Sequence, residues 1–280
     1  MIYILISGAS FGAMAIFVRA AYASGIDTTT LLFLRFAIAA VCLGVVMVAR
    51  RVPLPRGRYF VAAILMGAAG YALQSFCFFS ALHYASAGLV ALLLYLYPAI
   101  VTVLAALFLN EKMTRIKLIA LSLALTGSVL TIGPAGDAKP LGILLGVAAA
   151  VIYAIYITVG TRVLKQISPL QSATVVAASA AVVFGMVTMV KGAVLPASTQ
   201  GWGAVVAIAL ISTVVAVLTF FAGLERIGPV NASTLSTVEP IVTLVLAWLF
   251  LGEQIAPIRF IGGAMILSAV VLLARSRRAL

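Results

Sequence analysis

Long runs of hydrophobic residues alternate with short polar breaks along the whole chain. The breaks carry the residues of turns, as in "ASGID" (23–27), "VPLPRG" (52–57) and "GPAGDAKP" (133–140). Each apolar run is close to the length that a helix needs to cross about 30 Å of hydrocarbon. We therefore expect ten membrane-spanning helices, at residues 2–22, 29–49, 59–81, 86–109, 115–133, 141–161, 169–190, 203–223, 229–251 and 257–275.

The composition supports this membrane class. Of the 280 residues, 65% are hydrophobic and 9% are charged, whereas a soluble domain has about 25% charged residues. Little of the chain remains outside the spans, so no soluble domain is expected. Cys42 and Cys77 fall inside spans, which favours small buried side chains over a disulfide. The fold class we predict is an all-α polytopic membrane protein.

The positive charges indicate an orientation. A net charge of +12 could suggest nucleic-acid binding, but the cations flank the apolar spans instead of forming a basic domain. Ten spans place both termini on one side. Of the 18 Lys and Arg residues, 13 fall on that side, four fall on the other, and Arg35 lies within a span. Lys and Arg accumulate in cytoplasmic loops. This predicts a multi-pass protein of the cytoplasmic (inner) membrane with both termini cytoplasmic and no nucleic-acid partner.

The chain contains an internal repeat with an offset of 142 residues. "FFSALHYASAGLVALLLYLYPAIVTVLAALFLNE" (78–111) aligns without a gap with "FFAGLERIGPVNASTLSTVEPIVTLVLAWLFLGE" (220–253). Pro98 meets Pro240 and Glu111 meets Glu253, which are matches that apolar composition alone does not explain. Five spans per copy is an odd number, so the second copy enters the membrane from the opposite face. We predict two inverted five-helix repeats, at residues 1–133 and 141–276.

Three stretches carry a family resemblance. They are "SFGAMAIFVRAAYASGIDTTTLLFLRFAIAA" (10–40), "LLLYLYPAIVTVLAALFLNEKMTRIKLIALSLALTGSVL" (92–130) and "STVEPIVTLVLAWLFLGEQIAPIRFIGGAMILSAVVLLARSR" (236–277). Their order and spacing resemble the EamA-type members of the drug/metabolite transporter superfamily. The resemblance implies ten helices, cytoplasmic termini, and export or exchange of small organic solutes. "NE" at 110–111 departs from the commoner "GE".

Glu239 and Pro240 stand side by side in the ninth span. Proline deprives the carbonyl of Ser236 of its helical partner, and a carboxylate inside the membrane is costly and commonly functional. Ser236, Glu239 and Thr243 share one helical face. Glu239 is predicted either to bind a substrate amine or exchange a proton, or to satisfy the broken helix in a protonated or Arg-paired form. The family resemblance, which often places Glu before this proline, fits both interpretations.

Further candidates come from polar and aromatic positions in other spans. Arg35 is predicted either to extend toward the outer face or to bind a substrate carboxylate with its forked donors; the family's common "RF" at this place suits a structural role. Tyr95 and Tyr97 are two residues apart, so we expect at most one of them to line a cavity. Aromatic rings with polar tips suit an amphipathic solute, although buried tyrosines also simply pack. The remaining candidates for substrate binding are Tyr71, Gln74, Tyr153, Tyr156 and Thr213.

Pro98 and Pro240 are predicted to kink their helices. Glu111 and Glu253, at the ends of the fourth and ninth spans, are predicted to hold the N-terminus of the next helix or to act in gates by pairing with nearby cations. An intramembrane enzyme is disfavoured because no catalytic dyad stands out, and a channel is disfavoured because no charged rings occur. The predicted function is a secondary transporter that exports small metabolites such as amino acids by alternating access. Exchange of nucleotide-sugar-like or drug-like solutes is the alternative. No cofactor or metal is predicted. Coupling to protons or a counter-solute, and a monomeric or homodimeric state, are left open.

Overall fold

A computed structural model describes residues 1–81, 84–85, 90, 93–132, 139–251 and 257–278. These residues form helices and turns, with no strand among them. Seven of the helical segments are long and apolar enough to cross a membrane by length and composition, and two shorter apolar helices accompany them. The protein is an all-α polytopic membrane protein, as the hydrophobic pattern predicted.

Helical segments occur at each of the ten expected places, although the fourth is described mainly from residue 93 onward. The first half contains α1 (Ile2–Gly12), α2 (Met14–Ala23), α3 (Thr28–Ala49), α4 (Gly57–Leu65), η1 (Met66–Tyr71), α5 (Ala72–Ala81), α7 (Tyr97–Phe108) and α8 (Arg115–Ile132). The second half contains α9 (Pro140–Val163), α10 (Pro169–Lys191), α11 (Thr199–Ala209), η2 (Leu210–Val215), α12 (Ala216–Ile227), α13 (Pro229–Leu235), η3 (Ser236–Val238), α14 (Glu239–Leu251) and α15 (Pro257–Arg278).

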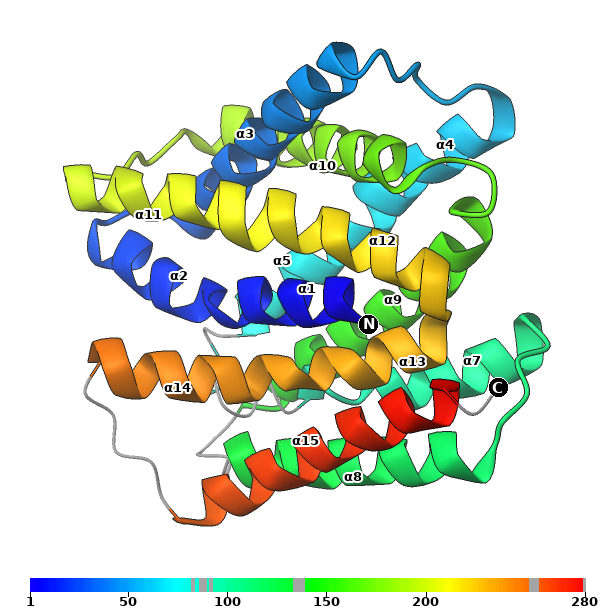
Figure 1. Cartoon of the computed structure of the whole chain (residues 1–280). Coiled ribbons are helices and arrows are strands. Elements are labelled where there is room, and N and C mark those ends of the chain that lie inside the picture. The colour runs from blue at the N-terminus through cyan, green and yellow to red at the C-terminus, as the bar shows by residue number, and fades with distance from the viewer. Residues whose placement is uncertain (82–83, 86–89, 91–92, 133–138, 252–256, 279–280) are drawn as a thin grey trace.

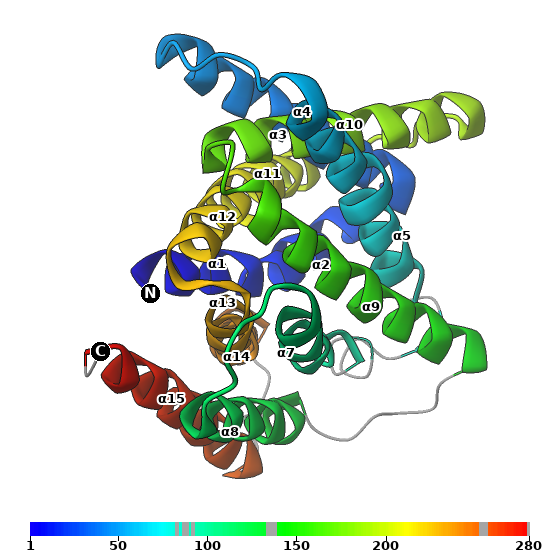
Figure 2. The ribbon, with the colours of Figure 1, turned by 90° about the vertical axis from the view of Figure 1, so that its right-hand side faces the viewer.

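Equivalent helices of the two halves pack against each other and run antiparallel. Helices α3 and α10 are joined at both ends: the amide of Gln171 donates to the carbonyl of Pro53 at 2.7 Å, and the backbone N–H of Val194 donates to Thr30 Oγ1 at 3.1 Å. The second equivalent pair, α8 and α15, lies at one edge of the bundle (Figures 1 and 2). Antiparallel packing of equivalent helices is the arrangement that an inverted repeat requires.

Other helix contacts are also related by the repeat: a contact between two helices has its counterpart between the two equivalent helices. Helix α1 packs on α12, and its equivalent α9 packs on α5. The third and eighth spans also share an irregularity, because each contains a π-helical turn, η1 in one and η2 in the other. Such π turns are rare and occur often at functional sites.

The boundaries of the two repeats, 1–133 and 141–276, stay a prediction.

Helix α3 begins at a well-formed N-cap. Asp27 accepts hydrogen bonds from the backbone N–H groups of Thr29 and Thr30 and from the Thr29 hydroxyl. Burial raises the pKa of the Asp27 carboxyl, but these hydrogen bonds lower it by more, so the pKa lies below its ordinary value. The side chain therefore stabilises the helix as a carboxylate.

Replacing Asp27 with alanine is expected to lower the free energy of unfolding by about 1 kcal/mol, because the first N–H groups of α3 lose their acceptor. Asp27→Asn should retain most of this stability at neutral pH. Because the folded-state pKa is depressed, the contribution is present above the unfolded pKa and is lost as the pH falls through the folded one. Thermal unfolding in detergent at pH 7 and at pH 3 measures both effects. An Asp27→Ala variant as stable as the wild type would contradict the assignment.

Candidate functional site

The central cavity lies where the two halves meet, and one cation and one carboxylate line it. Its volume is about 60 Å³, which is well below the roughly 300 Å³ or more of typical ligand pockets. Six of the predicted binding residues line this cavity, namely Arg35, Tyr71, Gln74, Tyr95, Tyr153 and Glu239.

Arg35 is buried, with 2% of its surface exposed. Its Nε donates to Thr213 Oγ1 at 2.7 Å, and its Nη2 donates to the hydroxyl of Tyr71 at 3.1 Å. The guanidinium carbon lies 4.9 Å from the ring centre of Phe36, which adds a cation–π contact. Arg35 therefore does not extend to the membrane surface, and the snorkelling interpretation of this residue is wrong. Its charged group belongs to the cavity wall.

Glu239 enters the cavity from the start of α14. The turn before it, η3, is a 3₁₀ turn in which the backbone N–H of Glu239 donates to the carbonyl of Ser236. Ser236 is the residue whose carbonyl Pro240 leaves without a helical partner. The carbonyl of Ser236 thus accepts a hydrogen bond from the backbone, and the side chain of Glu239 is not needed to satisfy it. Tyr95 lines the same cavity as this carboxylate.

Arg35 and Glu239 line the same cavity, yet they form no ion pair with each other in the part of the chain that the structure describes. The donors of Arg35 go to neutral hydroxyls. Charges buried in a protein are ordinarily paired, because removing them from water is costly. The cavity therefore holds one basic and one acidic side chain that are not paired with each other.

Aromatic rings form much of the remaining wall. Tyr97 contacts Tyr153 edge to face, with ring centres 4.8 Å apart. Tyr95 and Tyr97 both line the cavity, so the expectation that at most one of them would do so is wrong. Residue 95 lies in a turn before α7, where helical spacing no longer decides the direction of a side chain. Sequence reasoning also missed Phe11, Met14, Phe79 and Leu94, whose apolar side chains carry no signal that separates them from ordinary core residues.

The other predicted binding residues lie outside the cavity wall. Thr213 holds Arg35, and Tyr156 stacks behind Tyr71 with ring centres 5.4 Å apart. The hydroxyl of Ser236 donates to the carbonyl of Ala232 at 2.9 Å, and that of Thr243 donates to the carbonyl of Gly12 at 3.0 Å. The two hydroxyls are therefore engaged with backbone carbonyls.

Both prolines open a helix after an irregular turn. Pro98 occupies the first turn of α7, after the turn at residues 95–96, and Pro240 follows η3 at the start of α14. Proline is well tolerated in the first turn because its missing N–H would have no intrahelical partner there. In both spans the interruption is a local break in the helix. It places Tyr95 and Glu239, one from each half, at the cavity.

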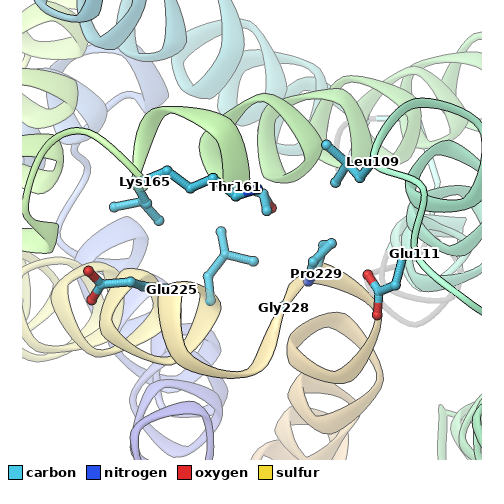
Figure 3. A pocket seen from close by; sticks show the side chains of 9 residues that line it. Leu109, Glu111, Thr161, Lys165, Glu225, Gly228 and Pro229 are labelled. Atoms are coloured by element: carbon cyan, nitrogen blue, oxygen red, sulfur yellow. The ribbon is translucent and has the colours of Figure 1, made fainter.

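A second and larger cavity opens on the face that carries most of the cations; we call it the basic-face cavity. Its volume is about 410 Å³. Figure 3 shows Lys165 and Glu225 at one end of it and Glu111 at the other. Glu111 accepts a hydrogen bond from Lys117 Nζ at 2.7 Å, as expected for a residue that fixes a helix connection. Glu253, its predicted counterpart, lies outside the described residues.

A layer of aromatic residues lies between the two cavities along α9 and α12. Tyr153 lines the central cavity, whereas Thr161 lines the basic-face cavity about 12 Å further along α9. Between these levels, Tyr156 packs on Phe221 with ring centres 6.0 Å apart, and Tyr153 packs on Phe220 at 6.3 Å. Tyr156, Phe220 and Phe221 are all buried. In this conformation the basic-face cavity and the central cavity share no lining residue.

Comparison with known proteins identifies transporters as the similar sequences. A model of the EamA-like transporter family matches residues 1–133 and 140–275. The uncharacterized transporter YcbK of Bacillus subtilis (strain 168) is 27% identical over 281 residues, which cover 93% of this chain and 88% of that protein. A Streptantibioticus cattleyicolor protein named "Probable terminal-alkyne amino-acid exporter" is 27% identical over 251 residues, 86% of this chain and 82% of that protein. A solved crystal structure has a TM-score of 0.87 with 20% identity over 99% of this chain and 97% of the other, a likeness in fold alone.

Proposed function

Because the chain belongs to the EamA-like transporter family, whose members are transporters and not enzymes, we propose that it exports small zwitterionic metabolites, amino acids above all. The observation that carries this proposal is the presence of Arg35 and Glu239, unpaired with each other, in one cavity. An amino acid supplies a carboxylate for the arginine and an ammonium group for the glutamate. The name of the Streptantibioticus relative, an amino-acid exporter, supports the same class of solute.

The aromatic wall indicates the rest of the solute. Tyr71, Tyr95, Tyr97 and Tyr153 surround the two charges with ring faces and polar tips. Such rings bind apolar and aromatic groups well, because they bury large areas and keep a hydroxyl available for a hydrogen bond. Amino acids with apolar or aromatic side chains are therefore the proposed substrates. Sugar nucleotides, the alternative class, would need several cations for their phosphates, and Arg35 is the one cation among the lining residues described.

Transport proceeds in this proposal by alternating access. The central cavity opens to one side and then to the other as the two halves move against each other. The aromatic layer of Tyr153, Tyr156, Phe220 and Phe221 closes the path to the basic-face cavity in the conformation described here. The protein resides in the cytoplasmic membrane with the basic face in the cytoplasm, as the distribution of Lys and Arg favours. A C-terminal epitope tag that antibodies reach only after permeabilisation checks this orientation.

Counterflow in proteoliposomes tests the proposed function. The purified protein is reconstituted with unlabelled phenylalanine, leucine or serine inside, and uptake of the same labelled amino acid is followed. We expect saturable counterflow for phenylalanine and leucine. A carrier exchanges internal unlabelled solute for external labelled solute, so the label accumulates transiently inside the vesicles, whereas a channel produces no such accumulation. Phenethylamine and 3-phenylpropionate, each lacking one charge, should compete at least 10-fold more weakly. Folded protein that mediates no counterflow of any of the three amino acids would refute the proposal.

A further inference from the structure

Arg35 connects the π-helical turns η1 and η2. Thr213 belongs to η2 in the second half, and Tyr71 is the last residue of η1 in the first half. The guanidinium donates to both hydroxyls at once, through Nε and through Nη2. The cation is therefore held by one acceptor from each half, at equivalent irregular turns.

The hydroxyl of Thr213 is fixed in direction. It donates to the backbone carbonyl of Ile208 at 2.9 Å, five residues earlier in the chain. Its proton is thus committed to the backbone, and a lone pair is left to accept from Arg35 Nε at 2.7 Å. Thr213 is 1% exposed and does not line the central cavity. Its hydroxyl therefore has no direct contact with the cavity and is connected to the cavity wall through Arg35.

These two bonds leave a defined set of donors for a solute. A guanidinium has five N–H donors, and Thr213 and Tyr71 engage one on Nε and one on Nη2. The three that remain belong to Nη1 and Nη2. That pair of nitrogens can donate two parallel hydrogen bonds to one carboxylate, the geometry that makes arginine selective for planar anions.

We propose that Thr213 is a positioning residue that sets the preference of the transporter for carboxylate-bearing solutes, by orienting the guanidinium of Arg35. This inference rests on the proposed function, because it assumes that Arg35 receives the solute carboxylate. Tyr71 is the second support of the guanidinium, and it also lines the cavity. Without the Thr213 hydroxyl, Nε loses its acceptor and the guanidinium rotates. Its Nη1 and Nη2 donors then no longer point in parallel toward the solute carboxylate.

A pair of ligands that differ by the carboxylate separates positioning from general structural damage. Binding of phenylalanine and of phenethylamine is measured by calorimetry on the full-length protein in lipid nanodiscs. The readout is the ratio of the two dissociation constants, which cancels any loss of active protein. Thr213→Val, which keeps the shape and removes the hydroxyl, is expected to reduce the preference for phenylalanine about 10-fold. Thr213→Ser, which keeps the hydroxyl, should retain the wild-type ratio within about twofold.

Thr219→Val is the matched control, because the Thr219 hydroxyl donates to the carbonyl of Val215, four residues earlier in the same span, and contacts neither Arg35 nor the cavity. Its ratio should equal that of the wild type. Tyr71→Phe removes the second acceptor and should lower the preference as well, which provides a test if Thr213→Val does not fold. An unchanged ratio in a folded Thr213→Val protein overturns the inference and leaves the proposed function standing; if Thr213→Val does not fold, an unchanged ratio in Tyr71→Phe does the same. Wild-type protein that binds no amino acid overturns both.

Discussion

Transport of amino acids should fall by at least about 100-fold when Glu239 is replaced by glutamine. In the proposed site this carboxylate is the counterion of the solute ammonium group, and truncating one partner of a buried charge pair costs 2–5 kcal/mol or more. A loss of 100-fold corresponds to about 2.7 kcal/mol, near the lower end of that range. The initial rate of counterflow at equal reconstituted protein measures the effect.

Two companion variants make this result specific. Glu239→Asp keeps the charge and should retain part of the activity. Glu225→Gln removes a carboxylate from the basic-face cavity, outside the central cavity, and should leave counterflow within a few-fold of the wild type. Wild-type rates in the Glu239→Gln protein would show that the carboxylate takes no part in recognition.

The same variant decides whether Glu239 couples transport to protons. If Glu239 exchanges a proton during the cycle, the wild type should accumulate solute in response to a pH gradient, because the carboxyl must bind and release a proton once per turnover. Glutamine cannot titrate, so residual transport by Glu239→Gln should no longer depend on that gradient. Dependence that persists in the variant would remove Glu239 from this role.

A large loss of stability is expected from Gly67→Ala. Gly67 lies in the π turn η1, which packs on α10. A Cβ atom at this position would overlap the carbonyl oxygen of Val176 and the hydroxyl of Ser179, and would lie 2.8 Å from the Cα of Val176. Two of these atoms are backbone, so no rotamer change relieves the overlap. Overpacking typically costs 1–3 kcal/mol and occasionally more; because the backbone itself must shift, we expect about 3 kcal/mol.

Gly44→Ala is the control for this substitution. Gly44 lies in helix α3, and a Cβ atom there would have no neighbour within 4 Å. Alanine should leave stability unchanged or raise it slightly, because it is the better helix former. Thermal unfolding of both variants in the same detergent gives the comparison. A Gly67→Ala protein as stable as Gly44→Ala would mean that η1 and α10 are not in close contact.

The positions of the helices could be predicted from the sequence because the bilayer imposes a simple rule. Backbone polar groups in hydrocarbon must be satisfied within the segment, so each crossing appears as one apolar run of defined length. The repeat was likewise visible, because Pro98 and Glu111 have matching partners 142 residues later. The π turns η1 and η2 were not predicted, since no residue pattern marks them.

The candidate site was predictable in part. Glu239 and Arg35 stood out because charges are rare inside spans, and both line the central cavity. Ser236 and Thr243 were named because they share a helical face with Glu239, yet their hydroxyls are engaged by backbone carbonyls. A helical face gives the direction of a side chain around its own helix axis. It does not show whether the cavity or another helix lies on that side.

The sequence by itself determined that this chain crosses the membrane many times, that its two halves are related, and that one carboxylate and one arginine are placed where lipid would not tolerate them. Only the tertiary structure decided that these two charges meet in one cavity without pairing, and that Thr213 and Tyr71 hold the arginine from opposite halves. The physical reason is that hydrophobicity fixes the depth of each residue in the bilayer. The rotation of each helix, and the contacts between residues far apart in the chain, follow from packing of helices that a one-dimensional pattern does not encode.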